Sequence, residues 1–287
     1  MHGALAIALP CKFGQSMKIK NARGSDLIWE ALDPKGEVWF DAQISLYDFS
    51  AIKTSDEEIA KKLKKILRSA VRDNSEFLST WSGFKVETQL EFPLDWGLGS
   101  SSTLISNIAQ WAEINPFHLY FSIFNGSGYD VACAEADQPI QYQLGEDQLH
   151  FHEIDFNPSF SKKLFFVHQG KKQDSESAVK IHGKKFRSNK EAIEKISAIS
   201  EAIVNVSSFS KFVDLLQEHE SIVSNVIDVP TLKKAQFPDF KGSVKSLGAW
   251  GGDFFLAASE EGSEYVQSYF KSRGLETIIK YDDMIKS

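Results

Sequence analysis

The amino-acid sequence predicts an α+β protein built from two domains. A strand-rich beginning is followed by helices and then by a closing module that mixes both kinds of element. The 287 residues include 22 phenylalanines, which favour a sheet-containing core, and the hydrophobic share of 42% is close to that of globular proteins. We place the domain boundary after Asn157-Pro158, which gives an N-terminal domain over residues 1–160 and a C-terminal domain over residues 161–287.

The first ninety residues favour strands with one long helix. Asp33-Pro34-Lys35-Gly36 predicts a turn, and the segment from Phe84 to Phe92 alternates as a half-buried strand does. A helix is expected over residues 55–78, because apolar residues recur there at helical spacing and Ser55 can cap the first turn. The strands expected in this part are residues 4–9, 16–20, 26–32, 37–44 and 84–92.

The rest of the chain is richer in helices. Residues 93–99 break the preceding strand, and an apolar helix begins at Ser100. The helices expected from there on are residues 100–112, 116–124, 129–136 and 260–273, with two or three more within 174–225. The strands expected are residues 140–144, 149–154, 163–167, 244–249, 253–258 and 276–281.

Composition limits the classes of partner and compartment. A net charge of −7 argues against nucleic acid as a main partner, because phosphate backbones call for a basic surface. The two cysteines, Cys11 and Cys133, have neither metal-binding nor disulfide spacing, which indicates a reduced, cytoplasmic protein. No apolar run approaches 18 residues, so we expect no membrane anchor.

The strongest motif is Pro93-Leu94-Asp95-Trp96-Gly97-Leu98-Gly99-Ser100-Ser101-Ser102-Thr103. A strand runs into a glycine-rich turn, and the turn runs directly into an apolar helix. Gly97 and Gly99 allow a close approach of a ligand to the backbone, and the first-turn amides and dipole of the helix favour an anion such as phosphate. An ordinary turn with a serine cap is the alternative, but several small residues before a helix disfavour it.

This string resembles the second signature of the GHMP kinases, Pro-x-x-x-Gly-Leu-Gly-Ser-Ser-Ala, with Ser102 in place of alanine. The resemblance implies a two-domain GHMP kinase fold, with an ATP-binding N-terminal part like ribosomal protein S5 domain 2 and a ferredoxin-like C-terminal part. It also implies that Ser101 is a ligand of Mg²⁺. The residues that it assigns to the ATP phosphates in this loop are Gly97, Leu98, Gly99, Ser100, Ser101 and Ser102.

A second motif, Gly126-Ser127-Gly128-Tyr129-Asp130-Val131-Ala132, begins 29 residues after Gly97. Taken alone, it favours a loop whose Asp130 simply caps the next helix. Beside the first motif it resembles Gly-Ser-Gly-Phe-Asp-Val-Ala of phosphomevalonate kinases and the Gly-Tyr-Asp-Ile-Ala string of a bacterial GHMP subgroup. The resemblance implies that Asp130 is the general base and that Ser127 and Gly128 contact the acceptor substrate.

Two further segments resemble the same kinases. Gly248-Ala249-Trp250-Gly251-Gly252-Asp253 is similar to the third signature, Gly-Ala-Gly-Gly-Gly, with tryptophan replacing one glycine; a plain tight turn is the alternative. The resemblance assigns Gly251 and Gly252 to ATP and Asp253 to the acceptor. The lysine segment after residue 167 is either a solvated loop or an anion grip, and its candidate substrate-binding residues are Lys171, Lys172 and Ser175.

The chain also departs from the family pattern. Members begin with a strand carrying Gly-Lys and then Gly-Glu-Tyr, about twenty residues before the Gly-Ala of this chain, so we expect that the first strand of the fold is missing and that Met1 is an internal methionine. Mevalonate kinases place a magnesium-binding glutamate where this chain has Leu119, and Glu113 is out of register with that position. Magnesium then relies on Ser101, water and ATP oxygens.

The predicted function is an ATP- and Mg²⁺-dependent kinase acting on a small anionic acceptor. The resemblance points to a phosphomevalonate or mevalonate kinase-like enzyme of the mevalonate pathway of isoprenoid biosynthesis, cytoplasmic and either monomeric or homodimeric. Diphosphomevalonate decarboxylase and homoserine or sugar kinases are the alternatives within the fold. A nucleotide-binding protein without catalysis is the alternative from another class.

Overall fold

The computed structural model describes residues 3–79, 82–145, 149–170, 189–248, 250 and 253–286. The chain forms two compact units. Unit 1 contains residues 1–12, 95–97 and 136–287, and unit 2 contains residues 13–94 and 98–135. The domain boundary expected near residue 160 lies inside unit 1, because strand β1 (Ala6–Ala8) pairs with β7 (Ile140–Leu144) and β7 pairs with β8 (Leu149–Glu153). The two compact units therefore divide the chain at other residues than the predicted domain boundary does.

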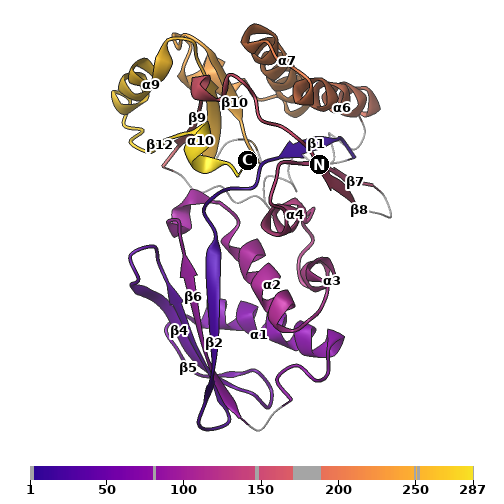
Figure 1. Ribbon diagram of the computed structural model, residues 1–287, viewed down its shortest axis with the longest axis vertical. Coiled ribbons are helices and arrows are strands. Elements are labelled where there is room, and N and C mark those ends of the chain that lie inside the picture. Colours follow the sequence, from indigo (N-terminus) through magenta and orange to yellow (C-terminus); the bar gives the residue numbers. More distant parts are fainter. Residues whose placement is uncertain are drawn as a thin grey trace. The chain divides into compact units, whose positions relative to one another are not determined.

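Unit 2 is built on a five-stranded sheet (Figure 1). Its strands are β2 (Gln15–Ala22), β3 (Asp26–Leu32), β4 (Val38–Ser45), β5 (Ala51–Thr54) and β6 (Gly83–Leu90). They lie in the order β2-β6-β3-β4-β5, and only the β3–β6 pair is parallel. Alternate residues of β3, namely Leu27, Trp29 and Ala31, are buried, which gives the sheet one core face.

The described residues of unit 2 form the helices α1 (Glu57–Asp73), α2 (Ser100–Trp111), α3 (Pro116–Phe121) and α4 (Tyr129–Glu135). Leu67 of α1 and Ile105 and Ile108 of α2 are fully buried in the same core as the inner residues of the sheet. Helix α2 also packs against α4. The apolar faces of α1 and α2 therefore fix the direction of α2, whose first turn follows the glycine-rich loop.

The start of α1 differs from the sequence prediction. Its cap is Asp56, whose carboxylate accepts hydrogen bonds from the Glu58 and Ile59 amides at 2.9 and 3.0 Å. The predicted cap, Ser55, instead accepts a hydrogen bond from the Asp41 amide at 2.9 Å. Because Ser55 is held by strand β4, the helix begins at residue 57; it ends at residue 73 rather than 78, where Asn74 takes an extended conformation.

Unit 1 contains a four-stranded antiparallel sheet. Strand β9 (Leu164–His168) is followed by helices α6 (Lys190–Val204), α7 (Phe209–Ile227) and α8 (Leu232–Gln236), then by β10 (Ser243–Ser246), β11 (Phe254–Ala258), α9 (Gly262–Lys271) and β12 (Ile278–Lys280). The spatial order is β10-β11-β9-β12. The first strand of this module lies between the third and the fourth, which is the ferredoxin-like arrangement, so this part of the fold prediction is confirmed.

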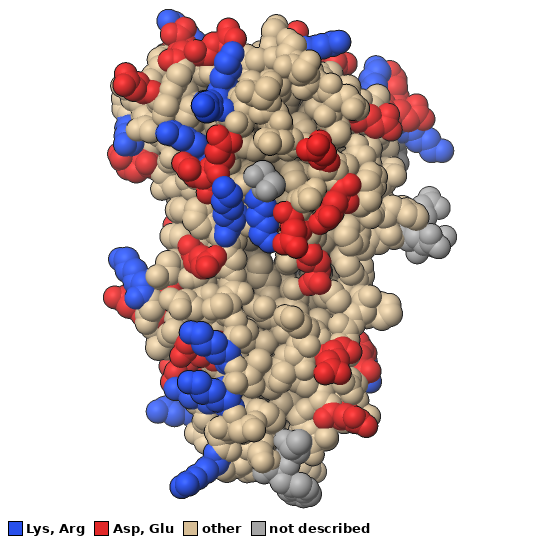
Figure 2. Space-filling view, in the orientation of Figure 1, with Lys and Arg blue, Asp and Glu red and all other residues tan. Residues whose placement is uncertain are grey.

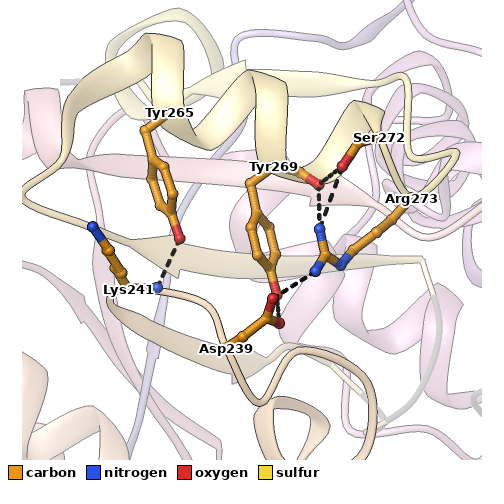
Figure 3. Close-up of polar contacts among 6 residues, drawn as sticks. All are labelled: Asp239, Lys241, Tyr265, Tyr269, Ser272 and Arg273. Atoms are coloured by element: carbon orange, nitrogen blue, oxygen red, sulfur yellow. Dashed lines mark hydrogen bonds and ion pairs between the residues drawn. The ribbon is translucent and has the colours of Figure 1, made fainter.

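Helix α9 is attached to the loop before β10 by a polar and aromatic cluster (Figure 3). The Tyr269 hydroxyl donates to Asp239 at 2.6 Å, and the Arg273 guanidinium donates to the same carboxylate at 2.8 Å while lying 3.7 Å from the centre of the Tyr269 ring. The Lys241 amide donates to the Tyr265 hydroxyl at 2.9 Å. Burial raises the pKa of Tyr269 above its ordinary range, and its hydrogen bond to Asp239 adds to the shift.

The described surface carries charges of both signs. On the face in Figure 2, Lys and Arg side chains are spread among Asp and Glu side chains. Several are paired, as Lys85 is with Glu30 at 2.9 Å on the outer face of the unit 2 sheet. Among the described residues, no helix has both the length and the apolarity that a membrane crossing requires.

Candidate functional site

The glycine-rich loop leads into α2 without a side-chain cap. After a short 3₁₀ turn over Leu94–Trp96, Gly97 and Gly99 have φ angles of 67° and 79°, in the left-handed region that glycine adopts without strain. Gly99 is the cap residue and makes no side-chain hydrogen bond, whereas its carbonyl accepts from the Ser102 amide at 2.9 Å. The amides of Ser100 and Ser101, the first two residues of α2, are therefore left without a serine or aspartate cap and suit an external anion.

The three serines of this turn differ in exposure. Ser101 is exposed, Ser100 is half-buried, and Ser102 is only 5% exposed. Ser102 occupies the position where the family signature has alanine, and it is buried as an alanine there would be. Ser101 thus offers the most accessible hydroxyl of the first turn. Leu98, which lies between the two glycines of the loop, is half-buried.

Asp130 lies next to the start of α2. It is in the first turn of α4 and half-buried, and a Cβ built on Gly99 would lie 3.6 Å from its Cβ and 3.9 Å from its Cγ. Near the other end of α4, the hydroxyl of Ser106 in α2 donates to Glu135. The two helices are therefore held together along their length, and unit 2 brings the first two motifs into contact.

The glycines before Asp130 lie close against aromatic side chains. A Cβ at Gly126 would come within 3.0 Å of the Tyr120 hydroxyl, and one at Gly128 would lie 3.0 Å from the ring of Phe121. Gly128 also has a φ of 78°. The two glycines therefore let the loop approach α3 closely just before α4 and Asp130. Ser127 between them is half-buried.

In unit 1 the beginning of the glycine-rich loop contacts the third motif. A Cβ at Gly97 would come within 3.0 Å of the carboxylate of Asp253, so the two residues lie in direct contact. Asp253 has a φ of 46°, and its carbonyl accepts a hydrogen bond from the Gln169 amide at 2.8 Å. The Trp96 ring lies edge-on to Phe254, with ring centres 5.6 Å apart. Residues 95–97 therefore rest on the end of β9 and the start of β11.

Trp250, which stands where the third signature has a glycine, has a left-handed backbone conformation. Its φ is 59°, and its indole N–H donates to Glu220 of α7 at 3.3 Å. Glu220 is 2% exposed and lies 3.6 Å from the ammonium of Lys245, which in turn lies 3.3 Å from Nδ1 of His219. Burial and the neighbouring Lys245 charge lower the pKa of His219 well below its ordinary value. A side chain thus anchors this loop at a backbone position that normally suits glycine.

Five predicted site residues lie outside the described residues: Gly251, Gly252, Lys171, Lys172 and Ser175. Two residues that the motifs did not reveal support the loop. In unit 2, the Gln15 side chain accepts a hydrogen bond from the Thr103 hydroxyl at 2.9 Å. In unit 1, His168 is buried and contacts Asp95 and Trp96. Both contacts join residues distant in sequence, and neither residue type marks them in advance.

Neither position considered for a magnesium carboxylate supplies one beside the loop. Residue 119 is a leucine that is fully buried in the core. Glu113 follows the end of α2 opposite to Gly99, and the 12 residues of α2 span about 18 Å at about 1.5 Å per residue. Within the described part of the chain, no three His, Cys, Asp or Glu side chains form a group that could hold a metal ion. The exposed Ser101 hydroxyl fits a magnesium ion that keeps water and nucleotide ligands, as this ion often does.

No protein-family model and no curated protein matches this sequence. Solved structures do match over nearly the whole chain. Mevalonate kinase from Methanococcus jannaschii aligns with a TM-score of 0.69 and 14% identity, covering 100% of this chain and 92% of that one. Streptococcus pneumoniae phosphomevalonate kinase in complex with phosphomevalonate and AMPPNP aligns with a TM-score of 0.65 and 15% identity, covering 97% and 93%. Lactococcus lactis galactokinase complexed with galactose aligns with a TM-score of 0.61 and 12% identity, covering 100% of this chain and 90% of that one. The chain therefore has the two-domain fold of the GHMP kinases.

Proposed function

We propose that the protein is an ATP-dependent kinase that transfers the γ-phosphoryl group to a small anionic acceptor. The observation that carries the proposal is the contact between Gly99 and Asp130. It places a carboxylate beside a helix start at which no side chain caps the Ser100 and Ser101 amides, so that these two amides suit phosphate oxygens. Phosphoryl transfer depends mainly on aligning the attacking and leaving oxygens and on stabilising the charge delocalised over the phosphoryl oxygens. This arrangement brings a phosphate-binding element and a proton acceptor together.

In this mechanism the start of α2 binds the terminal phosphates of ATP, with Gly97 to Ser102 as the contacting residues. Asp130 orients the acceptor hydroxyl and takes its proton. If the acceptor is itself a phosphate monoester, that proton is largely absent at neutral pH, and Asp130 positions the attacking oxygen. Magnesium, when bound with ATP, neutralises phosphate charge, and Ser101 is the residue that we assign to it.

For the acceptor we propose mevalonate or phosphomevalonate. Lys171, Lys172 and Ser175 would bind its anionic group, and Ser127, Gly128 and Asp253 would line its site. The proposal is supported by the Gly-Ser-Gly-Tyr-Asp string and by the similarity in fold to mevalonate and phosphomevalonate kinases. The absence of nucleic acid and membrane partners, the cytoplasmic location and the monomeric or homodimeric state stay predictions.

The test is Asp130→Asn, with Glu135→Gln as the matched control. Both changes turn a carboxylate of α4 into an amide, but Glu135 is exposed near the far end of the helix and bonds to Ser106. With ATP and each acceptor in turn, we expect Asp130→Asn to lower kcat by about 10²–10⁴-fold, since general bases contribute roughly this much. ATP affinity should be unchanged. Full turnover in Asp130→Asn would refute the assignment.

A sugar kinase is a second candidate, since the fold also matches galactokinase and a heptose 1-phosphate kinase. ADP release measured with mevalonate, phosphomevalonate, homoserine and galactose separates these acceptors. Release of carbon dioxide from diphosphomevalonate would instead indicate the decarboxylase. ATP binding without turnover on any acceptor would indicate the non-catalytic alternative.

A further inference from the structure

His168 lies at the end of β9 and is 6% exposed. Both of its ring nitrogens have backbone partners. The Gly170 amide lies 3.3 Å from Nδ1, and the Asp95 carbonyl lies 3.1 Å from Nε2. These partners belong to two different segments: Gly170 lies just after β9, and Asp95 lies two residues before Gly97.

The two contacts determine where the ring proton resides. A backbone N–H can only donate, so Nδ1 accepts and carries no proton. A carbonyl can only accept, so Nε2 must carry the proton and donate it. The neutral Nε2–H form satisfies both partners at once, whereas an imidazolium would have no acceptor for the Gly170 amide.

Aromatic contacts hold the ring between the same segments. The ring centre of Phe254 lies 5.0 Å from that of His168, and the ring centre of Trp96 lies 6.4 Å away. Phe254 directly follows Asp253, which touches Gly97. His168 therefore contacts the start of the glycine-rich loop, the start of β11 and the residues after β9, all within unit 1.

We propose that His168 is a positioning residue for the ATP phosphates: its Nε2–H fixes the Asp95 carbonyl, and thereby the turn that presents Gly97. This inference rests on the proposed kinase function. Its two hydrogen bonds are chemically distinct, so they can be removed one at a time. An amide side chain reproduces one ring nitrogen or the other, depending on its length.

The experiment compares His168→Gln with His168→Asn. The longer glutamine places its NH₂ near the position of Nε2 and keeps the donor to Asp95. The shorter asparagine places its carbonyl near the position of Nδ1 and keeps the acceptor for Gly170. We expect ATP to bind His168→Gln within about twofold of the wild type and His168→Asn about tenfold more weakly, the upper range for one neutral hydrogen bond. His152→Gln, a change at an exposed histidine of β8, is the control and should leave ATP binding unchanged.

A second measurement does not depend on catalysis. Hydrogen exchange of the Gly170 amide should be faster in His168→Gln, which loses its acceptor, than in the wild type or His168→Asn. The ¹⁵N spectrum of the wild-type imidazole should show the Nε2–H tautomer, even if neither variant folds. An Nδ1–H tautomer, or equal effects of the two variants on ATP binding, would overturn the inference. If the wild type does not bind ATP, the proposed function fails, whereas the tautomer and the exchange pattern still decide the role of His168 in holding the loop.

Discussion

The contact between Gly97 and Asp253 permits a quantitative test of how the glycine-rich loop is held. In Gly97→Ala, the new Cβ comes within 3.0 Å of the Asp253 carboxylate, and the residue must keep a φ of 67°. The left-handed conformation costs a non-glycine residue about 1–2 kcal/mol, and overpacking costs typically about 1–3 kcal/mol. Their sum predicts a loss of about 2–5 kcal/mol in the free energy of unfolding.

A double-mutant cycle separates the two contributions. Asp253→Gly removes the carboxylate and tolerates the φ of 46° at that position, so Gly97→Ala should cost only about 1–2 kcal/mol in this background. The coupling energy from urea unfolding should then be about 1–3 kcal/mol. Asp253→Asn is the control, because its side chain has the same size and should leave the full cost of Gly97→Ala in place. Additivity of Gly97→Ala and Asp253→Gly within about 0.5 kcal/mol would refute the contact as the cause.

Three further predictions concern described residues outside the loop. Asp56→Ala should lower the free energy of unfolding by about 0.5–2 kcal/mol in urea, because it removes the cap of α1; no change would mean that the cap is dispensable. The free energy of unfolding should fall as pH drops below about 6.5, because His219 is then protonated in the unfolded chain but, with its lowered pKa, not in the folded chain. Urea titrations at several pH values measure this slope, and His219→Asn should flatten it. An unchanged slope in the variant would contradict the assignment to His219. In an ultraviolet titration Tyr269 should ionise above the ordinary tyrosine range, and Asp239→Ala should lower its pKa; a pKa indifferent to Asp239 would contradict the hydrogen bond as a cause.

Local pattern was enough to predict much of the fold. The alternation along Phe84 to Leu90 predicts β6, because a strand that buries one face needs an apolar residue at every second position. The small residues before Ser100 predict the turn into α2, because that turn depends on adjacent glycines. The ferredoxin-like order of unit 1 came from the family resemblance, since the order of strands in a sheet depends on pairings between distant segments. The roles of the site residues stay predictions.

The errors and omissions have a common physical cause. Ser55 was expected to cap α1, but a hydrogen bond from Asp41 on a distant part of the chain engages its hydroxyl. Gln15 and His168 support the loop through partners 88 and 73 residues away. Each depends on a long-range contact, which one unaligned sequence does not encode locally.

Trp250 illustrates the difference between a motif as a string of letters and a motif as a set of torsion angles. Glycine adopts a left-handed backbone without strain, but in this chain Trp250 has a φ of 59° and its indole N–H donates to the buried Glu220. Sequence signatures built on that glycine would pass over such proteins. A profile that scores backbone conformation together with a distant anchoring residue would find them.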